Sequence, residues 1–190
     1  MELILASASP RRHELLEKAG IKHTVLPTDT DETLPEGLEP QEAVMYLSQR
    51  KAEAALASGK VPDGAVVVAA DTIVWADGTI MGKPKDEADA RRMLECLSGG
   101  THDVFTGVTV TNRIKTYTEY EVTHVKMRRI RDSELDKYIA SGEPFGKAGA
   151  YAIQGLASKF ITHIDGDYTN VVGLPVACTC VLAADLGAEI

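Results

Sequence analysis

The chain has 190 residues, 44% of them hydrophobic, and a formal net charge of −8. This length can bury one hydrophobic core, so we expect a single domain over residues 1–190. No apolar run approaches the ~20 residues needed to span a bilayer, and the chain does not begin with a basic, apolar leader. The sequence therefore predicts a cytoplasmic protein without membrane contact, and its acidic balance argues against nucleic-acid binding.

The first half of the chain predicts alternating strands and helices. An apolar strand at residues 3–7 precedes a helix that begins at Ser9 and Pro10, because Ser caps helix N-termini and Pro suits the first helical position. A strand at residues 22–28 and an acidic loop at 29–40 lead to the longest predicted helix, residues 40–59. Residues 64–84 predict a long buried strand, a hairpin at Asp77 and Gly78, and a short return strand.

The second half adds hairpin strands to this pattern. A helix is expected at residues 86–100, paired strands at 102–112 and 115–130, and a helix at 132–142 capped by Asp132 or Ser133. A glycine-rich loop at 143–158, a strand at 159–167 and a helix at 174–187 follow. We expect Cys178 and Cys180 to be buried, reduced residues of this last helix. The pattern predicts an α/β fold with a mixed, twisted sheet flanked by helices.

The stretch "LASASPRR" offers several anion-binding groups at one strand-to-helix turn. A helix start presents free backbone N–H groups and a partial positive charge, and Ser7 and Ser9 add hydroxyl donors. Arg11 and Arg12 add planar guanidinium groups suited to phosphate. The stretch is not a P-loop, and a helix cap followed by two solvated arginines explains the same residues.

Asp71 lies in the middle of an apolar strand, where an unpaired carboxylate would cost several kcal/mol. It must therefore be paired, bind a metal, or face a pocket, and Thr72 after it points to the opposite side of the strand. Lys83 lies between Gly82 and Pro84, whose tight turn would hold it as a point charge toward phosphate. An ordinary exposed turn lysine is the alternative.

Three further residues have both a functional and a structural interpretation. Glu32 belongs to an acidic loop with Asp29 and Asp31, where spaced carboxylates suit Mg²⁺ or a solvated surface equally. Lys51 lies within a helix, where a solvated position is the simplest expectation. The amide of Gln154, in a glycine-lined loop, could read a base edge through one donor and one acceptor.

Together and in this order, these stretches resemble the Maf family of nucleoside triphosphate pyrophosphatases. The resemblance is carried by "LASASPRR", "TDTDE", "SQRKAEA", "AADTIV", "MGKP", "VFTGV", "SGEPFGKAGAYAIQG" and "GDYTNVVGLP", which run from Leu5 to Pro175. It implies an elongated, two-lobed α/β fold with a central cleft, similar to that of the inosine triphosphate pyrophosphatases. It also implies a cytoplasmic enzyme, often a homodimer, that cleaves between the α- and β-phosphates with a divalent cation, Mg²⁺ or Mn²⁺.

The resemblance also implies a role for each matched residue. Arg-Arg, Asp-Thr and "AYAIQG" are similar to the branch that prefers dTTP and UTP. In that branch the match implies Asp71 as proton acceptor, and Arg11, Thr72 and Gln154 in base selection. With the interpretation from the residues, this predicts the following site: Ser7, Arg11, Arg12, Lys51 and Lys83 on the triphosphate, Thr72 and Gln154 on the base, and Glu32 and Asp71 on the metal, with Asp71, Glu32 and Lys83 taking part in catalysis.

Two alternatives remain open at this point. One is a pyrophosphatase for methylated GTP or deaminated purine nucleotides, against which only the Gln154 loop argues, through the resemblance. The other is a non-catalytic regulator of cell division or septum formation. A regulator of that kind would be expected to lack Asp71 or Glu32, and this sequence has both.

Overall fold

The computed structural model describes all residues, 1–190, and contains one seven-stranded mixed sheet. Its strands are β1 (Leu3–Leu5), β2 (Thr24–Val25), β3 (Val66–Ala76), β4 (Thr79–Met81), β5 (Thr101–Thr111), β6 (Thr116–Met127) and β7 (Ile161–Asp165). The order is β2-β1-β3-β5-β6-β7, and β4 pairs with β3. β1 is parallel to β2 and β3, whereas β4 and β7 pair antiparallel with β3 and β6. The predicted mixed α/β sheet flanked by helices is confirmed.

The chain divides into two compact units. The first contains Met1–Asp71, Thr106–Glu121 and Gly173–Ile190, and the second contains Thr72–Phe105 and Val122–Val172. Strands β3, β5 and β6 contribute residues to both units. The single domain expected over residues 1–190 stays a prediction.

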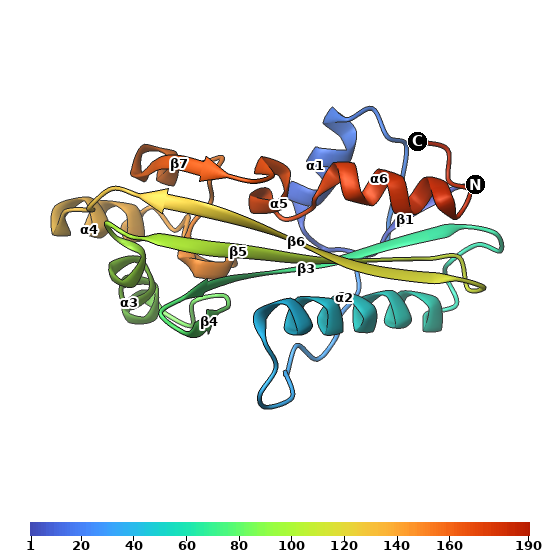
Figure 1. Cartoon of the computed structure of the whole chain (residues 1–190), viewed down its shortest axis with the longest axis horizontal. Coiled ribbons are helices and arrows are strands. Elements are labelled where there is room, and N and C mark those ends of the chain that lie inside the picture. The colour runs from blue at the N-terminus through green and yellow to red at the C-terminus, as the bar shows by residue number, and fades with distance from the viewer. The chain divides into compact units, whose positions relative to one another are not determined.

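The first unit carries α1 (Pro10–Lys18), α2 (Pro40–Ala57) and α6 (Val176–Asp185). Figure 1 shows α1 and α6 on one side of its strands and α2 on the other. Small apolar residues join α2 to the sheet in one cluster, because Ala52 and Ala55 of the helix pack with Ile4, Val67 and Ala69 of β1 and β3. The two chain ends meet here, since the amino group of Met1 donates to the carbonyl of Gly187 at 3.1 Å.

Capping interactions explain where α2 begins. Pro40 occupies the first helical position, and the backbone N–H of Glu39 donates to the carboxylate of Glu42 at 2.9 Å. No helix of the protein is long and apolar enough to cross a bilayer.

The second unit carries α3 (Glu87–Leu97), α4 (Asp132–Ala140), α5 (Tyr168–Val172) and two short 3₁₀ turns, η1 (Ala148–Ala150) and η2 (Leu156–Phe160). α3 packs against α4 and η1. The loop between α4 and β7 therefore lies close to a helix, and its glycines at 146 and 149 adopt left-handed φ values of +75° and +67°. Glycine is needed there because L side chains rarely adopt such backbone angles.

Most predicted elements are confirmed, with four local differences. Ser9 occupies the N-cap position of α1 but its side chain makes no capping hydrogen bond. The N-cap of α4 is Arg131 rather than Asp132 or Ser133, because the Glu134 carboxylate accepts the Arg131 N–H at 3.0 Å. Helix α5 was not predicted. Cys178 and Cys180 form no disulfide and are only half-buried, because one side of α6 is exposed, as their neighbour Val181 shows.

Candidate active site in the first unit

The carboxylate of Asp71 is buried in β3 and paired with a lysine. Asp71 is 7% exposed, and the ammonium of Lys51 donates to its Oδ1 at 2.5 Å. Of the interpretations that the sequence left open for Asp71, the structure shows a charge-assisted pair. Lys51 is not a solvated helix residue, since only 12% of its side chain is exposed.

Lys51 joins two carboxylates rather than one. Its Nζ also donates to Oε1 of Glu32 at 3.0 Å, although Glu32 lies 19 residues earlier, in the loop between β2 and α2. A compact ammonium with three donors can hold two acceptors at once. The structure thus brings Glu32, Lys51 and Asp71 together, and we call them the carboxylate–lysine cluster.

The rest of the acidic loop behaves differently. Oδ1 of Asp31 accepts the Thr33 N–H at 2.9 Å and the Thr33 hydroxyl at 2.6 Å, and these bonds lower the pKa of Asp31. Asp31 is therefore engaged in its own turn, which fixes the loop backbone next to Glu32.

A close approach of α2 to β5 brings Lys51 to Asp71. At Gly107, a Cβ atom would lie 2.3 Å from the backbone oxygen of Val44, so only glycine lets the helix come this near. One turn further along α2, the Ser48 hydroxyl lies 2.9 Å from the hydroxyl of Thr109 in β5. In the sequence, the stretch "VFTGV" supports only the family resemblance, and nothing in it indicates that Gly107 packs against a helix.

The start of α1 forms a second group in the same unit. Arg12 donates through Nε to the carbonyl of Gly173 at 2.6 Å and through Nη1 to the Ser7 hydroxyl at 3.2 Å. The backbone N–H of Ser9 also donates to that hydroxyl, at 3.2 Å. Because Ser7 Oγ accepts both bonds, its own proton points elsewhere and can serve an anion.

The two arginines have different surroundings, as expected for neighbours on a helix. Burial lowers the pKa of Arg12, while the nearby carboxylates of Asp71 and Glu32 act in the opposite direction. Burial also lowers the pKa of Arg11, whose acidic neighbour is Glu14 of the same helix. Arg12 therefore belongs electrostatically to the carboxylate–lysine cluster, and Arg11 does so less.

The remaining predicted residues belong to the second unit. Thr72 directly follows Asp71 in β3 and is half-buried, whereas Lys83 is exposed in the turn after β4. A backbone hydrogen bond holds this turn in place, because the N–H of Gly149 donates to the Gly82 carbonyl at 3.1 Å. Gln154 is exposed between the buried Ile153 and the half-buried Gly155, so its amide is available to a ligand.

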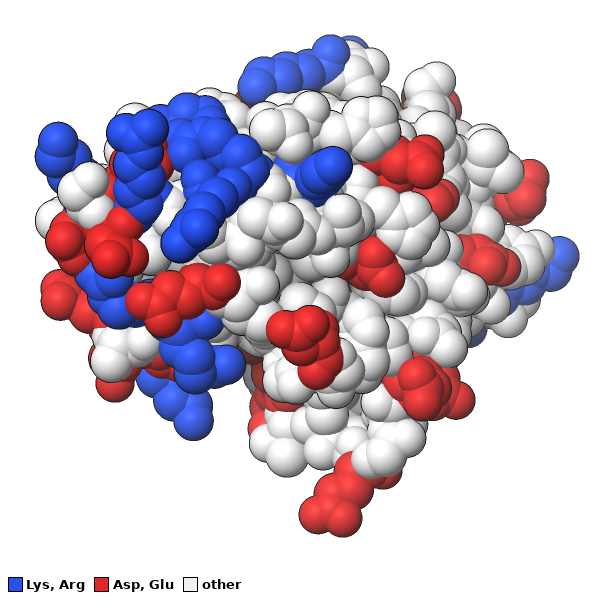
Figure 2. All heavy atoms as spheres, turned by 60° about the vertical axis from the view of Figure 1, so that its left-hand side comes forward, with Lys and Arg blue, Asp and Glu red and all other residues white.

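Basic residues of the second unit are engaged with acidic ones. Figure 2 shows Lys and Arg side chains interspersed with Asp and Glu on the face turned forward there. Ion pairs join Arg91 to Asp136, Arg92 to Asp89 at 2.7 Å, and Arg128 to Glu134 at 2.8 Å. These arginines therefore do not form a separate phosphate site.

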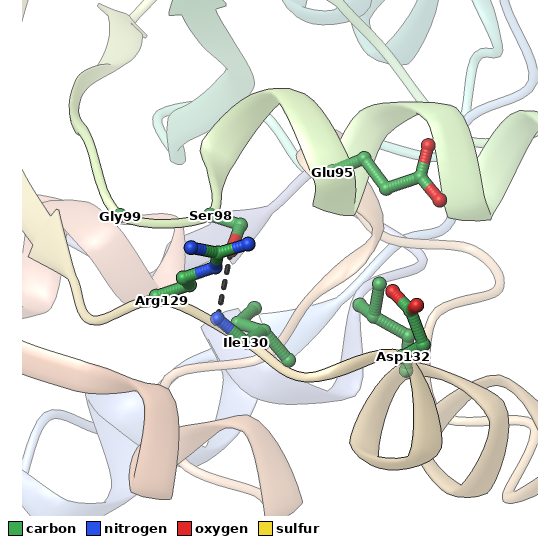
Figure 3. A pocket seen from close by; sticks show the side chains of 7 residues that line it. Glu95, Ser98, Gly99, Arg129, Ile130 and Asp132 are labelled. Carbon is green, nitrogen blue, oxygen red and sulfur yellow. Dashed lines mark hydrogen bonds between the residues drawn. The ribbon is translucent and has the colours of Figure 1, made fainter.

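A pocket of about 470 Å³ lies between α3 and the segment that leads into α4. Figure 3 shows the carboxylates of Glu95, on α3, and Asp132, at the start of α4, away from Arg129, and the Ser98 hydroxyl accepting the Ile130 N–H, at 2.7 Å. Its lining contains none of the residues predicted to be functional. The pocket carries charges of both signs and no buried polar group directed into it, so we assign it no ligand.

The chain is similar to known proteins over nearly its whole length. Residues 2–186 match the family model described as Maf-like protein. A protein of Citrifermentans bemidjiense named dTTP/UTP pyrophosphatase is 50% identical over 176 residues, covering 92% of this chain and 90% of that protein. A protein of Bacillus cytotoxicus with the same name is 47% identical, with coverage of 93% and 91%. A solved structure of the Staphylococcus aureus Ham1 protein aligns with 67% of this chain and 72% of that one, at 16% identity and a TM-score of 0.45.

The family model spans nearly the whole chain, and the curated relatives share about half of their residues with it over more than nine-tenths of its length. This chain belongs to the Maf-like protein family.

Proposed function

We propose that this protein hydrolyses dTTP and UTP to the nucleoside monophosphate and pyrophosphate. The observation that carries the proposal is the carboxylate–lysine cluster, in which a buried carboxylate, a lysine and a second carboxylate lie in the same unit as Ser7 and Arg12. Cleavage of a phosphoanhydride needs neutralised phosphate charge and an activated water, and these groups can supply both. The names of the two curated relatives support the choice of substrate.

The start of α1 is proposed to bind the triphosphate. The Ser7 hydroxyl proton, the free N–H groups of the first helical turn and the guanidinium of Arg12 are donors for phosphate oxygens. The missing side-chain cap at Ser9 supports this role, because it leaves those N–H groups without a side-chain acceptor. Arg11 and Lys83 would add charge to the same triphosphate.

Asp71 is proposed to accept the proton of the attacking water. A carboxylate can do so when it is held in place, and the bond from Lys51 holds Oδ1 of Asp71 at 2.5 Å. Lys51 would then contact phosphate oxygens while Asp71 and Glu32 serve water and metal. Lys51 would thus release the two carboxylates with which it is ion-paired in the structure and bind substrate phosphate instead.

The residues present fit a divalent cation. Glu32 and Asp71 each place a carboxylate oxygen within 3.0 Å of Lys51 Nζ. The two carboxylates therefore converge on one point, which the lysine ammonium occupies. No group of three His, Cys, Asp or Glu side chains suits a metal, so the chain would supply two carboxylate oxygens, and phosphate and water the rest. When bound, Mg²⁺ or Mn²⁺ would supply charge neutralisation at the phosphates.

Base selection is assigned to Thr72 and Gln154, with Arg11 contributing. An exposed amide such as that of Gln154 can pair one donor and one acceptor with the O4 and N3–H edge of thymine or uracil. This part of the proposal rests on the family resemblance and on the exposure of Gln154. The cytoplasmic location and the homodimer are proposed on the resemblance alone.

The test is pyrophosphate release from dTTP, UTP, dCTP, purine triphosphates and methylated GTP, each with and without Mg²⁺ or Mn²⁺. We expect metal-dependent release, fastest with dTTP and UTP. Release from purines or methylated GTP instead would retain the chemistry and overturn the base assignment. No release from any nucleotide would overturn the enzymatic proposal and favour a regulatory role.

A further inference from the structure

Glu143, which is not among the predicted site residues, binds the backbone just after Gln154. Oε1 of Glu143 accepts the backbone N–H of Leu156 at 2.8 Å, and Oε2 accepts that of Ala157 at 3.2 Å. These are the first two residues of η2, so one carboxylate holds two backbone donors immediately after the Gln154–Gly155 step. Both bonds are charge-assisted and cross 13 and 14 residues of loop.

Gly155 allows the carboxylate to lie this close. A Cβ atom at residue 155 would lie 2.0 Å from Oε1 of Glu143 and 2.6 Å from its Cδ. The φ of Gly155 is −106°, which other residues can adopt, so the glycine is required by the neighbouring carboxylate and not by its φ. Glu143 and Gly155 therefore depend on each other, although they lie 12 positions apart in the same loop.

Glu143 is itself held from several sides. Its backbone N–H donates to the Ser141 hydroxyl at 3.2 Å, and its carbonyl accepts from Lys147 Nζ at 2.6 Å. Burial and the neighbouring Glu143 carboxylate raise the pKa of Tyr138, whose ring packs edge-on against Phe160 at 5.6 Å between centroids. These contacts hold Glu143 where its carboxylate can accept the backbone N–H groups of Leu156 and Ala157.

We propose that Glu143 is a positioning residue that sets the orientation of Gln154 and thereby the preference for thymine and uracil bases. The inference rests on the proposed function, in which Gln154 reads the base. Glu143 touches no substrate in this proposal. It acts through the two N–H bonds that fix the backbone one and two residues after the Gln154–Gly155 step.

The physical expectation concerns selectivity more than turnover. Removing the carboxylate leaves two backbone N–H groups without their acceptor and lets residues 154–157 occupy several conformations. Gln154 then presents its amide correctly for only a fraction of the time, which weakens binding of the preferred base in proportion. The carboxylate–lysine cluster and the start of α1 lie in the first unit, and we expect their contacts to be unchanged.

The experiment compares Glu143→Ala, Glu143→Gln and Gln154→Ala with the unchanged protein. The measured quantities are kcat and KM for dTTP and dCTP, and hydrogen exchange at the amides of Leu156 and Ala157. We expect Glu143→Ala to lower the dTTP-to-dCTP ratio of kcat/KM about tenfold, mainly through the KM for dTTP, and to speed exchange at both amides. Glu143→Gln keeps one acceptor oxygen, so its dTTP-to-dCTP ratio should lie between those of Glu143→Ala and the unchanged protein.

Glu134→Gln is the matched control. The Glu134 carboxylate also accepts a backbone N–H, from Arg131 at 3.0 Å, and lies in the same unit at the start of α4. Its replacement should lower the melting temperature as Glu143→Gln does, yet leave the dTTP-to-dCTP ratio unchanged.

The outcomes separate this inference from the proposed function. If Gln154→Ala lowers the ratio but Glu143→Ala does not, the inference is overturned and the base assignment stands. If Gln154→Ala leaves the ratio unchanged, the base assignment fails, and the inference fails with it. A Glu143→Ala variant that loses kcat equally on every nucleotide would show a purely structural role and also overturn the inference.

Discussion

The two units hold their predicted functional side chains in different ways. In the first unit, Lys51 and Asp71 lie on a helix and a central strand, are largely buried and satisfy each other. In the second, Gln154 is exposed in a loop whose backbone is fixed by the carboxylate of Glu143. Buried charges need rigid elements because a misplaced charge is costly, whereas a base-reading amide needs only its backbone held. From this difference we expect that substitutions in the two units can change turnover and base preference separately.

We expect the largest effect on turnover from a substitution of Asp71. Asp71→Asn removes the proposed proton acceptor and should lower kcat about 10³-fold on every nucleotide, as loss of a general base does. Lys51 keeps its bond to Glu32, so folding should be largely intact, with a fall of about 1–3 kcal/mol in the free energy of unfolding. Steady-state kinetics and denaturant unfolding measure the two quantities.

Asp31→Asn is the control for this change. Asp31 belongs to the same acidic loop as Glu32 but bonds only within its own turn, to Thr33. It should keep near-normal turnover. Near-normal turnover of Asp71→Asn would instead remove Asp71 from the reaction.

A glycine contact in the first unit gives the next largest effect. Gly107→Ala would place a methyl group 2.3 Å from the Val44 oxygen, and a helix backbone cannot turn aside as a side chain can. We expect the free energy of unfolding to fall by about 3 kcal/mol, with lost turnover as α2 withdraws Lys51 from Asp71. Denaturant unfolding and kcat should change together. A fully active, equally stable variant would contradict the proposed link between Gly107 and Lys51.

Much of this arrangement was predictable from the sequence. The order of elements follows from hydrophobic periodicity and from Gly and Pro, and a buried strand carboxylate such as Asp71 requires a partner on electrostatic grounds alone. The partner itself could not be derived. Lys51 looks like any helix-surface lysine in the sequence, and only the close approach of α2 to β5 at Gly107 places it beside Asp71.

Long-range backbone contacts account for what the sequence did not reveal. The carbonyl of Gly173 as acceptor for Arg12 lies 161 residues away along the chain, and backbone groups leave no residue signal. Glu143 was visible only as a loop carboxylate, because its acceptor role depends on how residues 143–157 fold back. The N-cap at Arg131 was missed because the carboxylate of Glu134, not the cap side chain, satisfies the helix start.

A smaller effect is expected from a buried histidine that supports the second unit. His102 is 3% exposed, its Nε2 lies 2.7 Å from the Tyr151 hydroxyl, and burial lowers its pKa from 6.5 to about 4. The unfolded chain therefore binds more protons than the folded one between pH 6.5 and 4, and stability falls as the pH is lowered through this window. The loss attributable to His102 reaches about 2 kcal/mol at pH 5.

His102→Gln should flatten this part of the stability profile, measured as the free energy of unfolding at several pH values. His124→Gln provides a contrast of opposite sign, because the Asp103 carboxylate raises the pKa of His124. The His124 contribution is fully present below pH 6.5 and is lost as the pH rises through the folded pKa. A profile unchanged by His102→Gln would show that other groups cause the acid loss.

The smallest effect on stability is expected for Gly155→Ala, which is the counterpart in the second unit of Gly107→Ala in the first. Gly155→Ala meets the end of a flexible side chain, the Glu143 carboxylate, which can move away by rotating. We expect a loss of only about 1 kcal/mol in the free energy of unfolding, together with a lower dTTP-to-dCTP ratio.

A double-mutant cycle with Glu143→Ala tests this cause. Once the carboxylate is gone the new methyl group has space, so Gly155→Ala should cost almost nothing in that background, and the two changes should not add. Additive losses would mean that Gly155 is required by its backbone alone. Non-additive losses of stability and of base preference would show that the contact between Glu143 and Gly155 sets both. We expect kcat on the poorer nucleotides to stay unchanged in all three variants.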